Sequence, residues 1–170
     1  MTETRDIRSI PVSERADDAV TPLSKLIEDG RPPWAWSNLD DEEAQELHTS
    51  LLWFIHTYNS QYAVEVTHVI PACWPEHPRM VHELPVLYWA WWMSHRDRKA
   101  TPGDAAVFYS ETLVRFQDRL PTLLGDGAVT CRKGKHSGES TELRNAVTTA
   151  EKTHPVRGVV TDWRHQIFGS

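Results

Sequence analysis

Apolar residues recur at three- and four-residue steps in the stretch LDDEEAQELHTSLLWFIHTYNSQY, residues 39–62. This period places them on one face of an amphipathic helix. Ser37 or Asn38 is expected to cap its start, and four acidic residues follow in the first turn, where the helix dipole favours them. The predicted core face comprises Ala44, Leu47, Leu51, Phe54, Ile55, Tyr58 and Tyr62.

A second helix is predicted from Pro78, a residue suited to the first helical position. Its apolar residues cover most of the circumference, which is typical of a central helix packed on several sides. Pro85 cannot donate to the Val81 carbonyl, so we expect a kink there or a new helix start. The main stripe comprises Val81, Leu84, Tyr88 and Trp91, with Leu87, Trp89 and Trp92 beside it.

A third helix is predicted over residues 100–120. Thr101 and Asp104 form a capping box around Pro102, and Pro121 is expected to end the helix. LLGDGAVTC, residues 123–131, is interpreted as a turn followed by a short extended piece. The third core stripe comprises Tyr109, Leu113, Phe116 and Leu120.

These patterns predict a mainly α fold, a compact three- or four-helix domain over residues 34–131. Residues 1–33 are polar and interpreted as mostly disordered, although a helical turn in 22–30 can dock Leu23, Leu26 and Ile27. Residues 132–170 are interpreted as a flexible tail whose segment 156–168 can re-dock.

Composition indicates a soluble globular protein, with 39% hydrophobic and 25% charged residues. The net charge of -6 predicts no general attraction to nucleic acid. Neither a signal peptide nor an apolar run of roughly 20 residues is present, so we expect a cytoplasmic protein with reduced thiols and no membrane contact.

Two Cys–His pairs carry the candidate chemistry. Three residues separate Cys73 from His77, and four separate Cys131 from His136. Two thiolates and two imidazoles would complete a tetrahedral structural zinc site, if the second and third helices are antiparallel neighbours. The alternative is that the cysteines are buried apolar groups while His77 caps a helix or lies in solvent.

Motifs for catalysis are missing from the sequence. It has no phosphate-binding loop, dinucleotide turn or nucleophile elbow, and HELPV at His82 lacks the second imidazole of a zinc protease. A catalytic thiol at Cys73 with His77 or His82 stays an alternative without an oxyanion-hole motif. The sequence therefore favours a protein that is not an enzyme.

Tryptophan is abundant, with eight residues in the chain. Trp89, Trp91 and Trp92 cannot all face one core from one helix. They are interpreted either as a helix with two packed faces, or as an exposed ring that marks a surface for a protein partner or a second copy of the chain.

The segments CWPEHPRMVHELPVLYWAW and AAVFYSETLVRFQDRLPTLLGDGAVTCRKGKH together resemble the actinobacterial domain of unknown function 4913, over about residues 74–136. The family helix would run through the position of Pro85. The resemblance implies an accessory protein of a mobile element, such as a plasmid, prophage or integrated conjugative element, and no named reaction. The matching positions are Trp74, His77, Pro78, Leu84, Leu87, Trp91, Gly127, Cys131 and His136.

The predicted function is thus a non-enzymatic protein-binding module, with no cofactor expected unless the two Cys–His pairs bind zinc. The alternative is a nucleic-acid-associated factor that uses basic side chains on phosphate. A small enzyme is the less favoured alternative. The candidate nucleic-acid contacts are Arg96, Arg98, Lys99, Arg132, Lys133 and Lys135.

Overall fold

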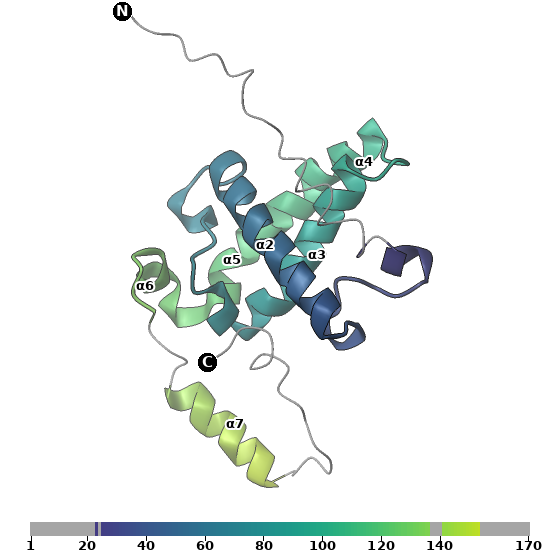
Figure 1. Ribbon diagram of the computed structural model, residues 1–170. Helices are drawn as coiled ribbons and strands as arrows, with labels where there is room; N and C mark the ends of the chain where they lie inside the picture. The colour runs from purple at the N-terminus through teal and green to yellow at the C-terminus, as the bar shows by residue number, and fades with distance from the viewer. Residues whose placement is uncertain (1–22, 24, 137–140, 154–170) are drawn as a thin grey trace, which may run out of the picture.

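The computed structural model describes residues 23, 25–136 and 141–153 (Figure 1). This part of the chain is helical and contains no strand, which confirms the mainly α prediction. None of its helices is long and apolar enough to cross a membrane. Its helices are α2 (Asp41–Gln61), α3 (Pro78–His95), α4 (Pro102–Val107), a π-helical turn (Phe108–Thr112), α5 (Leu113–Leu124), α6 (Ala128–Arg132) and α7 (Thr141–Thr153).

The N-terminal cap of helix α2 lies two or three residues later than predicted. A 3-10 turn occupies Trp36–Asn38, and Asp40 is the cap in place of Ser37 or Asn38. The Asp40 carboxylate accepts from the Glu43 backbone N–H at 2.9 Å, and the Glu43 carboxylate accepts from the Asp40 N–H at 3.0 Å. This reciprocal box satisfies two donors of the first turn.

Helix α3 runs unbroken through Pro85, so the predicted new start is wrong. Proline leaves the carbonyl of Val81 without its helical donor. The indole Nε1–H of Trp36 donates to that carbonyl at 2.8 Å. A side chain 45 positions away thus replaces the missing backbone bond, which removes much of the cost of a proline inside a helix.

The third predicted helix is divided and longer than expected. The Thr101–Asp104 box is present, with the Thr101 N–H donating to Asp104 at 2.8 Å. A π-helical turn then joins α4 to α5, and α5 continues past Pro121 to Leu124. Leu123 and Leu124 are both buried, so apolar packing accompanies the added turn.

The core lies where α2 crosses α3 and α5 (Figure 1). The predicted faces of α2 and α3 are buried in it. Leu23 and Leu26 are also buried, and Arg31 pairs with Glu43 at 2.8 Å. The packed unit therefore begins before the predicted boundary at residue 34.

The region directly after α5 differs from prediction. Residues 128–132 form the short helix α6 rather than an extended piece. Helix α7 lies within the stretch interpreted as a flexible tail. The predicted disorder of residues 1–22 and the re-docking of 156–168 lie outside the described residues.

Candidate metal centre

The four residues singled out by spacing converge in space. One ligand atom each from Cys73, His77, Cys131 and His136 lies within 4.8 Å of every other. His77 Nε2 is 3.7 Å from the Cys73 sulfur and 3.4 Å from the Cys131 sulfur. His136 Nδ1 is 3.6 Å from the Cys131 sulfur. This Cys2His2 cluster can bind a metal ion.

These separations match the edges of a coordination tetrahedron. With Zn–S near about 2.3 Å and Zn–N near about 2.0–2.1 Å, a tetrahedral site has sulfur–nitrogen edges of about 3.6 Å. The three measured sulfur–nitrogen distances, 3.4, 3.6 and 3.7 Å, bracket that value. A central ion therefore requires only small side-chain shifts along these edges.

Local structure presents the first pair. Cys73 and His77 flank a 3-10 turn, Trp74–Glu76, and the buried indole of Trp74 anchors that turn in the core. Pro78 begins α3 directly afterwards, as predicted. His77 occupies the cap position but makes no side-chain cap bond, so the capping alternative is wrong and its imidazole faces the sulfurs.

A left-handed turn presents the second pair. Cys131 is buried on α6, and Gly134 follows the helix with φ of 72°. The Gly134 N–H donates to the Cys131 carbonyl at 3.0 Å, and the Lys135 N–H donates to Thr130 at 2.9 Å. Glycine adopts this conformation without steric cost, and the reversal returns His136 to Cys131.

The backbone of Leu124 interacts with His77, whose Nε2 faces the sulfurs. Burial and the neighbouring His136 lower the pKa of His77, whereas the Leu124 bond opposes that change. Metal-binding histidines commonly donate their second N–H to a carbonyl in this way.

The end of α5 makes that carbonyl available. Gly125 follows Leu124 with φ of 69° and ψ of -160°, a conformation almost confined to glycine. From the sequence alone, the letters GDG at residues 125–127 indicate only the end of a helix. The contribution of the Leu124 backbone to the site was therefore not predicted. A glycine directly after a helix was the one available signal, and it does not identify the group that the helix end contacts.

Electrostatics around the thiols favour a cation. Burial, followed by the nearby Cys131, raises the pKa of Cys73 to about 11. Two thiolates at this separation repel each other, and a divalent ion would reverse that repulsion. A raised pKa is the opposite of what an activated nucleophile needs, so the site does not favour the catalytic-thiol alternative.

Protein atoms supply four ligands, which is typical of a structural rather than a catalytic zinc site. His77 and Cys131 are buried, Cys73 is half-buried and His136 is exposed. The His77 and His136 rings meet edge to face with centroids 5.0 Å apart. An ion would reach the cluster from the side of His136.

The proposed tryptophan surface is wrong for two of its three residues. Trp89 and Trp91 are 1% and 6% exposed, so they belong to the core and not to a partner surface. Trp91 Nε1 donates to the Tyr62 hydroxyl at 3.0 Å. Only Trp92 is partly exposed, and its ring packs against Trp89.

The candidate nucleic-acid contacts fall into two separate groups. Arg96, Arg98 and Lys99 follow the end of α3, and Arg96 lies over the Trp91 ring. The group at 132–135 lies beside Cys131, near the start of α3. An 18-residue helix is about 27 Å long, so these groups do not form one basic surface. Arg132 also donates to the carbonyls of Thr67 and Val69.

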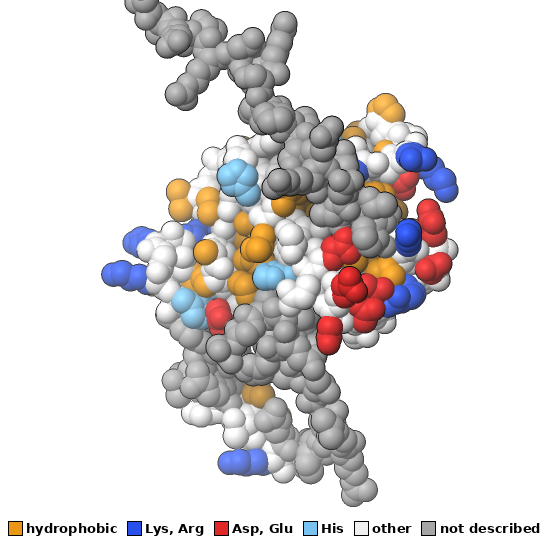
Figure 2. Space-filling view, viewed as in Figure 1, with side chains coloured by type: hydrophobic (Ala, Val, Ile, Leu, Met, Phe, Trp, Pro, Cys, Tyr) orange, Lys and Arg blue, Asp and Glu red, His pale blue; other side chains and the backbone are white. Residues whose placement is uncertain are grey.

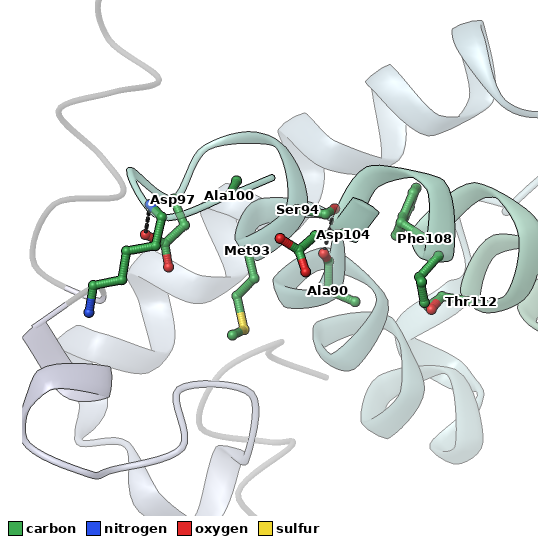
Figure 3. A pocket seen from close by; sticks show the side chains of 10 residues that line it. Ala90, Met93, Ser94, Asp97, Ala100, Asp104, Phe108 and Thr112 are labelled. Atoms are coloured by element: carbon green, nitrogen blue, oxygen red, sulfur yellow. Dashed lines mark hydrogen bonds between the residues drawn. The ribbon is translucent and has the colours of Figure 1, made fainter. Parts of the chain in front are cut away.

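A pocket of about 390 Å³ opens between the end of α3 and the α4 region (Figure 3). Its acidic groups have local roles: Asp97 accepts the Lys99 N–H at 2.9 Å, and Asp104 caps α4. The Thr101 bond lowers the pKa of Asp104, which reflects capping and not catalysis. It is lined by Ala90, Met93, Ser94, Asp97, Lys99, Ala100, Asp104, Val107, Phe108 and Thr112.

No family model, curated protein or solved structure matches the chain. The resemblance to the actinobacterial domain therefore stays a prediction. The candidate metal centre rests on the geometry of this chain: the ligand distances and the burial of the four residues.

Proposed function

We propose that this protein is a zinc-stabilised helical domain, in which Cys73, His77, Cys131 and His136 bind one Zn²⁺. The convergence of four ligand atoms within 4.8 Å, from segments 54 positions apart, carries the proposal. Zinc suits a mixed sulfur and nitrogen set of this shape better than magnesium or calcium, which prefer oxygen.

The role of the ion is to secure α6. This helix has only five residues, too few to be stable alone in water, and it buries only Ala128 and Cys131. Zinc would join it to the turn that begins α3. Because the unfolded chain has no preformed site, the free energy of zinc binding would stabilise the folded state.

Metal analysis of the purified protein tests this. We expect about one zinc per chain in the wild type and little in Cys131→Ser, since a structural site needs its four ligands. His56→Ala is the matched control, because His56 is exposed on α2 and distant from the cluster in sequence; it should retain zinc. A folded wild type that takes up no zinc after dialysis against the ion would refute the proposal.

Protein binding is a second candidate function. Large apolar side chains are exposed on α2 and on the connection after it: Leu52, Trp53, Val64 and Val66. Figure 2 shows hydrophobic side chains over the middle of α2, beside an acidic group at its start. An apolar area with a charged border is the usual composition of an interface. The accessory role that the family resemblance implies would require such a surface.

Light scattering during size-exclusion chromatography tests self-association through this area. If a second copy binds there, wild-type mass should rise with concentration, and Trp53→Ser should remove the rise because aromatic residues dominate interfaces. Val147→Ser changes an equally exposed residue on α7 and should leave the mass unchanged. A constant mass would exclude the homo-oligomer and leave a different protein as the partner to be sought.

A further inference from the structure

Both cysteines of the chain lie in the candidate metal centre. No other thiol competes for either of them, so any intramolecular disulfide must join Cys73 to Cys131. Their sulfurs lie within 4.8 Å of each other and both contact His77 Nε2. The arrangement that suits a metal ion thus also places the two thiols near each other.

Closing that distance requires movement of the chain. A disulfide needs sulfurs at about 2.0 Å and β-carbons within about 4.5 Å. The two sulfurs, now within 4.8 Å of each other, must therefore approach further through side-chain rotation and a shift of the backbone. Cys131 is on the five-residue α6, whereas Cys73 belongs to the turn anchored by Trp74. We expect the needed shift to fall on α6, whose buried side chains, Ala128 and Cys131, are small.

We propose that Cys73 and Cys131 form a reversible redox couple, in which hydrogen peroxide converts the zinc dithiolate into a disulfide and releases the ion. The release of zinc rests on the proposed function, whereas the formation of a disulfide from the two thiols does not. The two sulfurs supply two electrons, the peroxide and two protons become two waters, and Zn²⁺ leaves with no change in oxidation state.

Burial assigns an order to the two thiols. Cys73 is half-buried, whereas Cys131 is 3% exposed, so peroxide reaches the Cys73 sulfur first. In the zinc-loaded protein the ion holds Cys73 as a thiolate, which attacks one peroxide oxygen, giving a sulfenic acid and releasing water after proton uptake. The Cys131 thiolate then attacks the Cys73 sulfur, forming the disulfide and expelling hydroxide, which leaves as the second water.

Oxidation would alter the chain beyond α6. The disulfide keeps α6 tethered to the turn before α3, but it frees His136, the exposed fourth ligand. The reduced, metal-bound and the oxidised, metal-free proteins would share a core and differ at residues 134–136, which carry the fourth ligand. A reductant would restore the thiols and the metal site.

The experiment treats the full-length protein with hydrogen peroxide, once loaded with zinc and once freed of metal by a chelator. Intact mass spectrometry should show a loss of about 2 Da in both samples, for two hydrogen atoms removed. A chromogenic chelator should detect one zinc released per disulfide in the loaded sample. Dithiothreitol should reverse both changes.

Variants test the order. Cys131→Ser should trap a sulfenic acid at Cys73 that dimedone labels, whereas Cys73→Ser should label far less. Because serine variants can misfold without zinc, His136→Ala provides a second test: it keeps both thiols and should form the disulfide at lower zinc occupancy.

The outcomes separate the two proposals. Stoichiometric zinc binding with only oxygen additions to single cysteines, or only intermolecular dimers, overturns the redox couple and leaves the zinc site standing. Disulfide formation in a protein that never binds zinc overturns the proposed function and supports the dithiol couple alone.

Discussion

The two ends of α3 are held in different ways. Around its C-terminal half, aromatic rings pack directly: Trp91 stacks on His95 at 5.6 Å, and Phe54 meets both Tyr88 and Trp91 within 5.6 Å. At its N-terminal end, four ligand atoms from two separate segments lie within 4.8 Å of one another, and a bound ion would connect the two segments. The first end is stabilised by buried aromatic packing, whereas the second would gain further stability from the proposed zinc ion.

Some polar atoms of the aromatic end are paired with each other. The Tyr109 hydroxyl and His95 Nε2 lie 2.8 Å apart, and His95 Nδ1 lies 3.0 Å from the Trp91 carbonyl. The π-helical turn directly before α5 includes Phe108 and Tyr109, whose rings both meet His95. This end should therefore be insensitive to metal.

Truncation of the aromatic core should have the largest effect. Phe54→Ala removes a fully buried ring that contacts Tyr58, Tyr88 and Trp91, and it should lower the free energy of unfolding by about 3–5 kcal/mol. Urea denaturation followed by circular dichroism measures this. Leu52→Ala, on the exposed side of α2, should change it far less, and equal losses would contradict the assignment of the core.

Metal removal should act on one end only. With free zinc at 100 times its dissociation constant, binding stabilises by about 2.7 kcal/mol. Chelation should therefore speed amide hydrogen exchange in α6 by up to roughly a hundredfold, while exchange near Trp91 stays nearly constant. Uniform acceleration along α3 would show that the two ends are not independent.

The Gly125→Ala substitution should weaken the contact between the end of α5 and the candidate metal centre. A methyl group there would meet no atom within 4 Å, so the cost is conformational, about 1–3 kcal/mol. Relief of the strain would displace the Leu124 carbonyl and so reduce zinc affinity as well as stability. Thermal melting and zinc titration measure the two effects, and Gly103→Ala, within α4, is the control that should retain zinc affinity.

The smallest expected effect concerns pH. Burial lowers the pKa of His48, whose ring lies 6.1 Å from Trp74. The folded state then binds this proton less readily than the unfolded state, so stability falls as pH drops below the ordinary value of 6.5. Melting of chelator-treated protein between pH 7 and 5 should show a shallower decline in His48→Gln. An unchanged slope would assign the pH dependence to other groups.

Sequence reasoning located the ligand set but not its support. Cys73, His77, Cys131 and His136 were identifiable because thiols and imidazoles at short spacing have few other joint uses. The Leu124 carbonyl and the Trp36 bond to Val81 were not, since both depend on tertiary distance and a backbone carbonyl has no sequence signature. Pro85 led to the wrong prediction of a new helix start, because the bond from Trp36 to the Val81 carbonyl also depends on tertiary distance.

The surface was harder to predict than the core. Apolar periodicity identified the buried faces of α2 and α3, but it could not say which of three neighbouring tryptophans faces solvent when a helix is packed on several sides. Trp91 is buried because Trp53 and Phe54 of α2 pack against it, on a face that an isolated helix would expose. The two groups of basic residues were predicted to act together on phosphate, but they lie at opposite ends of α3.

The chain position of the ligand pairs has a consequence for biosynthesis. His77 and Cys131 are 54 residues apart, and α3, α4 and α5 lie between them. A nascent chain that has emerged only as far as α5 offers two ligands, too few to hold the ion tightly. Zinc would therefore be captured after the helical core has formed, so that uptake of the ion marks the completion of folding rather than its beginning.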